Sequence, residues 1–354
     1  MGVLGIMDQS SSFVASPRIA EPLRTQEADL LIPKIAKDET ALSEIEEKLA
    51  RLSTHHVLVN GDARDLHGIR DSSVHLVVTS PPYWTLKKYE KSEGQLGLVD
   101  NYDRFLAELD KCWRECYRVL VPGGRAVIVV GDVLLSRRKH KRHQVIPLHA
   151  DIQTRCRRLG FDNLAPIFWY KISNVAHEAQ GNGAGFLGKP YEPNAVVKHD
   201  IEYVLMERKP GGYRSPDPQT RLLSVIPSRN HSTWFRQVWD DIKGESTRQH
   251  PAPFPEELAG RLIRMFSFAK DTVLDPFVGT GTTMVAAARA GRNSIGVEID
   301  AKYCRLAADR LKDALSGIQS RKTFEFHRTW PMRPITSNPD HAKGHGASHE
   351  SLPC

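Results

Sequence analysis

The stretch Val74–Trp84 reads V-H-L-V-V-T-S-P-P-Y-W. Its first half is a run of apolar, largely β-branched residues, which is typical of a buried strand. Pro81 and Pro82 cannot donate hydrogen bonds to a neighbouring strand, so the strand must end before them. We therefore expect Ser80, the two prolines and Tyr83 at the carboxyl end of a strand, where open α/β sheets bind their ligands.

This strand end carries groups that suit a flat ring with an amino group. The ring could stack on Tyr83 or Trp84, while Ser80 and a proline-flanked carbonyl accept hydrogen bonds from the amino group. A site of this kind suits a nucleobase flipped out of a duplex. On these residues alone, an ordinary strand followed by a Pro-Pro turn is an equally good interpretation.

Composition narrows the class of protein. The chain has 354 residues, 40% of them hydrophobic, which is enough for one large globular domain or two small ones. A net charge of +7 suits a nucleic-acid partner, although many unrelated proteins are as basic. The five cysteines include no C-x-x-C pair, which favours a reduced, intracellular compartment. No stretch resembles a signal peptide or a membrane span, so we expect no membrane partner.

A second chemical centre is predicted near the C-terminus. The sequence from Asp271 reads D-T-V-L-D-P-F-V-G-T-G-T-T-M-V and continues to N-S-I-G-V-E-I-D. It predicts a strand over 272–274, a Gly-rich turn, a helix over 282–290, and a second strand ending in Glu298. The glycines let the backbone approach a ligand closely. Asp275 could bind an amino group or a hydroxyl, and Glu298 the two hydroxyls of a ribose.

Three ligands compete for this unit. A P-loop requires a lysine at the start of the helix, and none is present. A dinucleotide fingerprint is met by Gly279 and Gly281, but Met284 occupies its third position and Asp275 would repel a pyrophosphate. A ligand with a ribose, an amino group and no phosphate fits better, which favours S-adenosylmethionine.

The rest of the chain predicts helix–turn–strand units of a mostly parallel sheet covered on both faces. Asp62, directly after a strand, could accept a hydrogen bond from an adenine amino group or cap a turn. We expect two N-terminal helices within Glu27–Leu52, and the further elements are helices over Tyr102–Leu120 and Ile146–Leu159 and strands over Arg125–Val130, Ile167–Lys171 and Ile201–Glu207.

The loop Ser136–His143 reads S-R-R-K-H-K-R-H and follows the strand that ends at Val130. It should lie at the same edge of the sheet as Ser80, where basic side chains could hold phosphates; a solvated surface loop is the alternative. The candidate DNA-binding residues are Arg137, Arg138, Lys139, Lys141 and Arg142. Base-reading contacts are expected from the irregular segments Ser173–Lys198 and Arg208–Arg236.

Four motifs occur in a characteristic order: T-S-P-P-Y-W, I-F-W-Y-K, H-P-A-P-F-P and D-P-F-V-G-T-G-T-T. In this order they resemble the DNA amino-methyltransferases of the β arrangement, over about Val57 to Leu315. The serine of T-S-P-P-Y-W is most similar to members that methylate cytosine at N4, whereas adenine-N6 members more often carry Asp or Asn there.

The resemblance implies an α/β fold, the circularly permuted S-adenosylmethionine-dependent methyltransferase fold. Its sheet would have seven mostly parallel strands, one antiparallel strand among them, and helices on both faces. The catalytic domain would span 53–317, with a target-recognition region at about 172–236. Residues 1–52 would form a disordered and helical extension, and 318–354 a disordered tail.

The resemblance also implies roles for individual residues. Asp275, Phe277, Gly279, Gly281 and Thr282 would line the methionine side of the cofactor. Glu298 would hold the ribose, Asp62 the adenine, and Phe254 would close over the cofactor. The catalytic residues would be Ser80, Pro81, Pro82 and Tyr83. No metal site is predicted.

The expected partner is double-stranded DNA with a flipped target base, in the cytoplasm of a prokaryote. A cognate restriction endonuclease would act separately. Three alternatives remain on the sequence: an adenine-N6 enzyme, a catalytically silent DNA-binding protein on the same scaffold, and an RNA methyltransferase.

Overall fold

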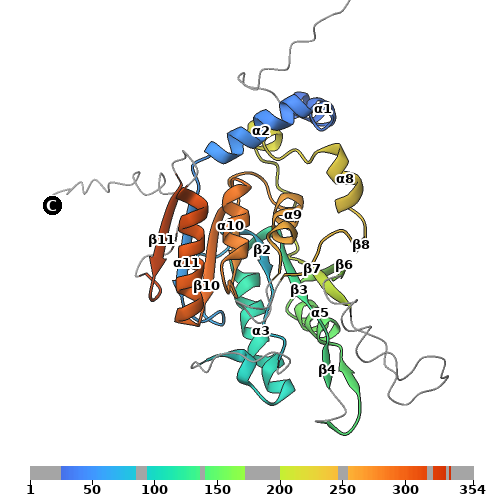
Figure 1. The fold of residues 1–354 in the computed structure, drawn as a ribbon, viewed down its shortest axis with the longest axis vertical. Helices are drawn as coiled ribbons and strands as arrows, with labels where there is room; N and C mark the ends of the chain where they lie inside the picture. The colour runs from blue at the N-terminus through green and yellow to red at the C-terminus, as the bar shows by residue number, and fades with distance from the viewer. Residues whose placement is uncertain are drawn as a thin grey trace, which may run out of the picture.

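The computed structural model describes residues 25–84, 94–135, 140–171, 200–245, 254–316, 322–331 and 335. Across these residues, nine strands form one sheet, with a prominent twist (Figure 1). Their order across the sheet is β11 (Thr323–His327), β1 (His55–Asn60), β10 (Asn293–Glu298), β9 (Thr272–Asp275), β2 (Val74–Thr79), β3 (Leu120–Val130), β7 (Ile201–Arg208), β6 (Asp162–Tyr170) and β8 (Val238–Trp239).

The sheet confirms the predicted architecture and corrects the strand count. Of these nine described strands, only β7 runs antiparallel to its neighbours; the other pairs of adjacent strands are parallel. The two strands beyond the predicted seven are β8 and β11, at opposite edges. Since β11 falls within 318–354, the prediction of a wholly disordered tail is wrong. In its sequence T-F-E-F-H, apolar and polar residues alternate, and Phe324 packs against a core cluster. This alternation is typical of a strand, but the sequence on either side is so polar that we did not predict one.

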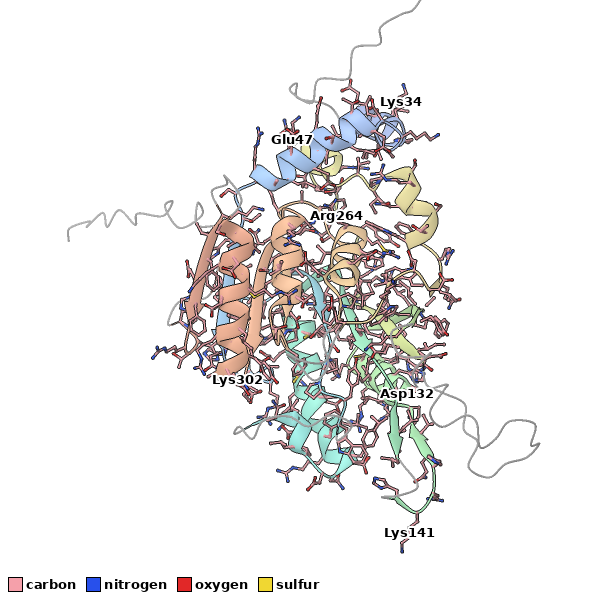
Figure 2. All side chains as sticks on the ribbon, in the orientation of Figure 1. Lys34, Glu47, Asp132, Lys141, Arg264 and Lys302 are labelled. Atoms are coloured by element: carbon pink, nitrogen blue, oxygen red, sulfur yellow. The ribbon has the colours of Figure 1, made fainter. Side chains whose placement is uncertain are left out.

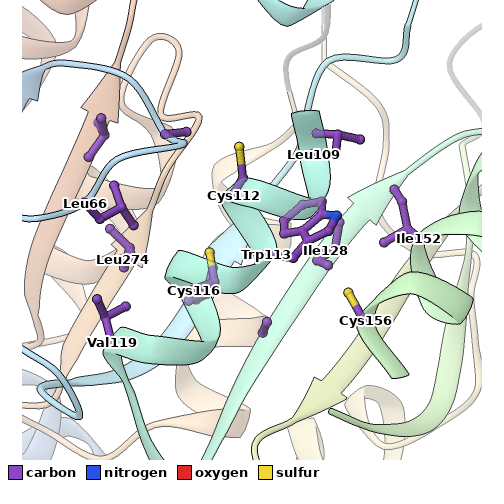
Figure 3. Close-up of a cluster of buried hydrophobic side chains, with 14 of the residues drawn as sticks. Leu66, Leu109, Cys112, Trp113, Cys116, Val119, Ile128, Ile152, Cys156 and Leu274 are labelled. Atoms are coloured by element: carbon purple, nitrogen blue, oxygen red, sulfur yellow. The ribbon is translucent and has the colours of Figure 1, made fainter. Parts of the chain in front are cut away.

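Helices cover both faces of the sheet. One face carries α3 (Tyr102–Val119) and α5 (Leu148–Arg158), and the other carries α9 (Glu256–Phe266), α10 (Thr282–Arg289) and α11 (Ala301–Ser316). Figure 3 shows Cys112, Trp113 and Cys116 of α3 packed toward the sheet, with Cys156 of α5 beside them. None of the helices among the described residues is long and apolar enough to cross a bilayer.

The start of α3 illustrates how local sequence sets these boundaries. Asn101 precedes the helix, and its side chain accepts a hydrogen bond from the backbone N–H of Arg104 at 2.8 Å. This cap satisfies a donor that has no partner within the helix. The buried residues Phe105, Leu109 and Trp113 then recur at helical spacing along one face, as predicted.

The N-terminal extension forms the two predicted helices, α1 (Thr25–Ile35) and α2 (Glu39–Arg51), although Pro33 lies within the last turn of α1 rather than ending it. Both helices pack against α7 (Pro218–Leu222). The apolar cluster they share contains Ala28, Ile35, Ala41, Leu42, Ile45, Leu49, Leu222, Val225 and Ala269. Residues 25–51 of the predicted extension are therefore part of the folded body.

Part of the expected target-recognition region lies away from Ser80. Arg214 makes a bidentate ion pair with Asp271, at 2.5 and 2.6 Å, and Ser224 accepts a hydrogen bond from the backbone N–H of Ala269. Both partners precede β9, so this chain segment runs along the amino edge of the parallel strands. Residues 218–234 also contain α7 and α8 (Ser228–Trp234), where we expected irregular structure.

The opposite edge carries a short hairpin, β4 (Val133–Leu135) with β5 (Gln144–Ile146), directly after β3. Figure 2 shows Lys141 of this hairpin and Lys34 of α1 at opposite ends of the molecule. Within the predicted recognition region, Arg221 and Arg229 make ion pairs with Asp29 of α1 and Glu39 of α2, whereas residues 172–199 fall outside the described residues.

We predict that the N-terminal helices contribute directly to stability. Leu42 is 5% exposed and Leu30 is 72% exposed. Leu42→Ala should lower the free energy of unfolding by about 2–5 kcal/mol, because it leaves a cavity in the cluster shared with α7. Leu30→Ala should change it by less than about 0.5 kcal/mol. Urea denaturation of both variants checks this; equal values would show that the extension is not packed on the body.

Candidate active site

A pocket of about 580 Å³ opens at the carboxyl ends of β1, β2, β9 and β10. Its lining residues are Gly61, Asp62, Ala63, Ser80, Pro82, Gly94, Gln95, Leu96, Pro276, Phe277, Glu298, Ile299 and Tyr303. The structure thus brings together residues from both predicted centres, which are about 200 positions apart in the chain.

Glu298 ends β10 and is fixed by two backbone groups. Its Oε1 accepts a hydrogen bond from the N–H of Asp300 and its Oε2 from the N–H of Gly279, each at 2.9 Å. Burial raises the pKa of this carboxyl group to about 7, against the lowering effect of the two hydrogen bonds. A carboxylate held in this way has lone pairs left to accept hydroxyl hydrogens.

Asp62 lines the same pocket and is also held in place. Arg64 donates from Nε to both carboxylate oxygens of Asp62, at 2.9 and 3.0 Å. The same guanidinium donates to Glu108, on α3, at 2.5 Å. The adenine-binding role implied for Asp62 therefore depends on a carboxylate whose orientation Arg64 already sets.

The T-S-P-P-Y-W motif contributes Ser80 and Pro82 to the pocket. Neither aromatic ring that we expected to stack on a base is among the lining residues. Tyr83 is only 4% exposed, and Trp84 donates from Nε1 to the carbonyl of Val99 at 2.8 Å. Tyr83 instead lies beside the Ser80 hydroxyl, with the two oxygens 3.1 Å apart.

Asp275 differs most from expectation. Its carboxylate is 1% exposed and turns into the protein instead of lining the pocket. It accepts hydrogen bonds from the hydroxyls of Thr79 and Thr283, each at 2.6 Å, and from the N–H of Phe277 at 3.0 Å. Burial raises its pKa to about 6, although the two hydroxyls and the amide oppose that shift. The described contacts of this carboxylate are therefore with the protein, and its cofactor-binding role stays a prediction.

Of the other predicted cofactor residues in this unit, one lines the pocket and three do not. Phe277 lines the pocket, and Gly279 has φ +51° and donates to Glu298. Gly281 has φ +85° and lies against α11, where a Cβ would come within 3.1 Å of the Ala307 side chain. Thr282 accepts a hydrogen bond from Arg310 at 2.9 Å and is absent from the lining. Through these contacts, Gly279, Gly281 and Thr282 support the Gly-rich loop.

Phe254 is also placed differently from expectation. It is 8% exposed and belongs to the apolar cluster of α9 and the sheet, outside the pocket lining. Conversely, Gln95, Leu96, Ile299 and Tyr303 line the pocket without having been predicted. Ile299 could have been inferred from its position after Glu298, whereas the polar stretch before Leu96 offered no signal.

The described part of the basic loop is exposed. His140, Lys141, Arg142 and His143 lie beyond the ends of β4 and β5 and are solvent-exposed. This hairpin follows Asp132 (labelled with Lys141 in Figure 2) at the carboxyl end of β3, which pairs in parallel with β2. Lys141 and Arg142 therefore extend from the edge that holds Ser80. Arg137, Arg138 and Lys139 fall outside the described residues.

The described residues of this site offer no groups for thiol or metal chemistry. The four cysteines in the described ranges, Cys112, Cys116, Cys156 and Cys304, are buried and do not line the pocket. Burial raises the pKa of Cys304 to about 12, which disfavours a reactive thiolate. Among the residues that the structure describes, no cluster of His, Cys, Asp or Glu could hold a metal ion.

The pocket's chemistry matches S-adenosylmethionine. Two acids, Asp62 and Glu298, line it, and none of its described lining residues is Lys or Arg. Such a pocket disfavours phosphates and accepts hydrogen bonds from ribose hydroxyls and an amino group. Phe277, Ile299 and Leu96 supply apolar walls for a flat ring.

We predict that the Thr79–Asp275 bond is worth about 1–3 kcal/mol of folding stability at pH 7.5, because Thr79→Val leaves a buried carboxylate oxygen short of a donor. Thr79→Ser keeps the hydroxyl and should cost about 1 kcal/mol or less. At pH 5, below the raised pKa of Asp275, the Val variant should lose less, because the neutral acid has less need of the donor. Urea denaturation at both pH values measures the difference, and equal losses for Val and Ser would contradict it.

Comparisons with known proteins agree with this geometry. The DNA methylase family model, which joins N6 and N4 methyltransferases, matches residues 74–309. The Type II methyltransferase M.MjaI of Methanocaldococcus jannaschii is 39% identical over 279 residues, covering 70% of this chain and 88% of that protein. The Type II methyltransferase M.MthZI of Methanothermobacter thermautotrophicus is 36% identical, covering 74% of this chain and 78% of that protein.

A solved structure extends the likeness to three dimensions. TTHA0409 of Thermus thermophilus, a putative DNA modification methylase in complex with S-adenosyl-L-methionine, is 51% identical with a TM-score of 0.63, and the match covers 77% of this chain and 98% of that one. The family match, the permuted order of the motifs and the shared fold agree. The chain therefore belongs to the DNA methylase family, as a β-class amino-methyltransferase that uses S-adenosylmethionine.

Proposed function

We propose that this DNA methyltransferase modifies the N4 amino group of cytosine at a specific site in duplex DNA. One juxtaposition supports the proposal above all. Ser80 and Pro82 of T-S-P-P-Y-W line the same pocket as Glu298 and Phe277 of the cofactor unit. A target amine at Ser80 would therefore lie beside the cofactor. The serine itself favours cytosine, by its resemblance to N4-specific members, and adenine N6 is the alternative within the same family.

The exocyclic amine of cytosine is a weak nucleophile because its lone pair is delocalised into the ring. Ser80 Oγ and the Pro81 carbonyl accept its hydrogens, which favours a pyramidal nitrogen with an available lone pair. When bound, the cofactor supplies an electrophilic methyl group on a sulfonium. The protein contributes positioning and electrostatics, and the amine proton is lost to solvent after transfer.

The cofactor would be held by a subset of the predicted residues. Glu298 accepts the ribose hydroxyls, Asp62 the adenine amino group, and Phe277 with the backbone at Gly279 borders the methionine side. The first three line the pocket, which is the observation that supports them. Asp275 keeps the loop in register with the catalytic strand, which is a supporting role.

DNA would approach the carboxyl edge of the sheet. Lys141 and Arg142 of the exposed hairpin contact phosphates, together with Arg137, Arg138 and Lys139 of the same basic loop. Such contacts orient the duplex without reading its sequence. The two curated relatives are named Type II methyltransferases, which supports a role as the modification enzyme of a restriction-modification system. The cognate endonuclease would act separately, in a prokaryotic cytoplasm.

The expected product is 4-methylcytosine. Purified protein, labelled S-adenosylmethionine and plasmid DNA from a methylation-deficient host should yield this nucleoside on digestion and mass spectrometry. Ser80→Ala should lose at least about 10²-fold in turnover, because it removes an acceptor aimed at the reacting amine, with cofactor affinity kept. A 6-methyladenine product would overturn the base, and normal turnover by Ser80→Ala would overturn the site. Label transferred to structured RNA in preference to duplex DNA would overturn the substrate.

Cofactor affinity should depend on pH through Glu298. Ribose hydroxyls donate best to the ionised carboxylate, and the raised pKa of about 7 means that this form grows from roughly one tenth at pH 6 to nine tenths at pH 8. The dissociation constant of S-adenosylmethionine should fall roughly tenfold over that range. Calorimetric titration measures it. Glu298→Gln, the matched control, should bind more weakly and with a flatter dependence; an equally steep dependence in that variant would refute the assignment.

A further inference from the structure

Ser80 lies at the start of a chain of polar groups that leads away from the pocket. Its Oγ is 3.1 Å from the phenolic oxygen of Tyr83. That oxygen lies 3.3 Å from Oε2 of Glu202, on β7, and 3.4 Å from the carbonyl oxygen of Val129, on β3. Lys171 donates to the other oxygen of Glu202 at 2.9 Å. The chain of polar groups that begins at Ser80 therefore joins four parts of the sheet, namely β3, β7 and the segments that follow β2 and β6.

The direction of these hydrogen bonds follows from which groups can donate. An ionised carboxylate is a stronger hydrogen-bond acceptor than a neutral hydroxyl or a backbone carbonyl, so the single proton of Tyr83 is directed toward Glu202, with the Val129 carbonyl close by. Tyr83 then has no proton to offer Ser80, and the bond between the two hydroxyls must be donated by Ser80. The ammonium of Lys171 balances the charge of the carboxylate at the end of this chain.

The direction of the Ser80–Tyr83 hydrogen bond determines what Ser80 can offer to a group in the pocket. With its proton directed toward Tyr83, the serine oxygen presents only lone pairs to the pocket that it lines. A serine proton directed at the target amine would instead occupy the nitrogen lone pair that must attack the methyl group. The direction of one hydroxyl proton thus decides whether Ser80 assists or obstructs the transfer.

We propose that Glu202 is a positioning residue that fixes Ser80 as a hydrogen-bond acceptor for the target amine. The proposal rests on the proposed function, because it requires an amine at Ser80. Glu202 acts through Tyr83 and is not among the residues that line the pocket. Tyr83 accordingly serves this site through its hydroxyl, which agrees with a side chain that is only 4% exposed.

Glu202→Gln tests the proposal with little change of shape. The amide N–H of glutamine can donate to Tyr83, which releases the tyrosine proton toward Ser80 and reverses the chain. We expect turnover to fall at least about tenfold, below the ~10²–10³ typical of removing a direct transition-state contact. The dissociation constant of S-adenosylmethionine and the KM for plasmid DNA should stay within about twofold, since Glu202 lies outside the pocket lining and is already engaged with Tyr83 and Lys171.

Asp162→Asn is the matched control. Asp162 makes an ion pair with Arg208 at 2.8 Å, which links β6 to β7 as Lys171–Glu202 does, but at the opposite end of the two strands. It has no bond to Tyr83 among the described contacts. Turnover of this variant should match the wild type. A loss equal to that of Glu202→Gln would reduce Glu202 to a structural link between strands and overturn the proposal.

A double-mutant cycle separates a shared chain from two independent effects. Tyr83→Phe removes the hydroxyl that connects Glu202 to Ser80, so adding Glu202→Gln to it should cause no further loss of turnover. Losses that multiply would overturn the proposal, as would full turnover in Glu202→Gln alone. Wild-type protein that binds cofactor but methylates no DNA would overturn the proposed function and this inference together, whereas an active wild type with an equally active Glu202→Gln overturns only the inference.

Discussion

The buried carboxylate of Asp275 is the constraint on which the rest of the site depends. It joins the last residue of the catalytic strand, Thr79, to the first turn of the helix after the cofactor loop, at Thr283. A buried ionisable group is costly unless its hydrogen bonds are complete. Strands β2 and β9 can therefore pair in only one register at low cost, and that register places Ser80 beside Phe277 and Glu298.

The two acids of the cofactor unit illustrate how one chemical group serves two purposes. Asp275 uses both oxygens inside the protein, whereas Glu298 is held by two backbone N–H groups and still lines the pocket. Burial raises the pKa of both. One acid fixes the geometry between motifs, and the other lines the pocket. They end two adjacent strands, β9 and β10, yet their surroundings assign them different roles.

Sequence reasoning succeeded where chemistry is local. Strand ends, Gly-rich turns and ordered motifs predicted that Ser80, Phe277 and Glu298 would meet at one edge of the sheet, and all three line one pocket. It failed where the orientation of a side chain depends on a partner that is far away in the sequence. The inward turn of Asp275 depends on Thr79, 196 positions away. The position of Arg214 depends in the same way on its ion pair with Asp271, 57 positions away, and no local sequence pattern indicates either partner.

The neighbouring strands β2 and β9 impose an order on synthesis. Their paired residues Leu76 and Val273 are almost 200 positions apart, so the catalytic strand can pair with β3 early but must wait for most of the chain before β9 exists. Contacts of such long range close slowly, and domains emerge from the ribosome N-terminal end first. A nascent or truncated chain could therefore expose its basic hairpin while lacking β9 and the cofactor loop. Competence to modify DNA would arise only near the completion of translation.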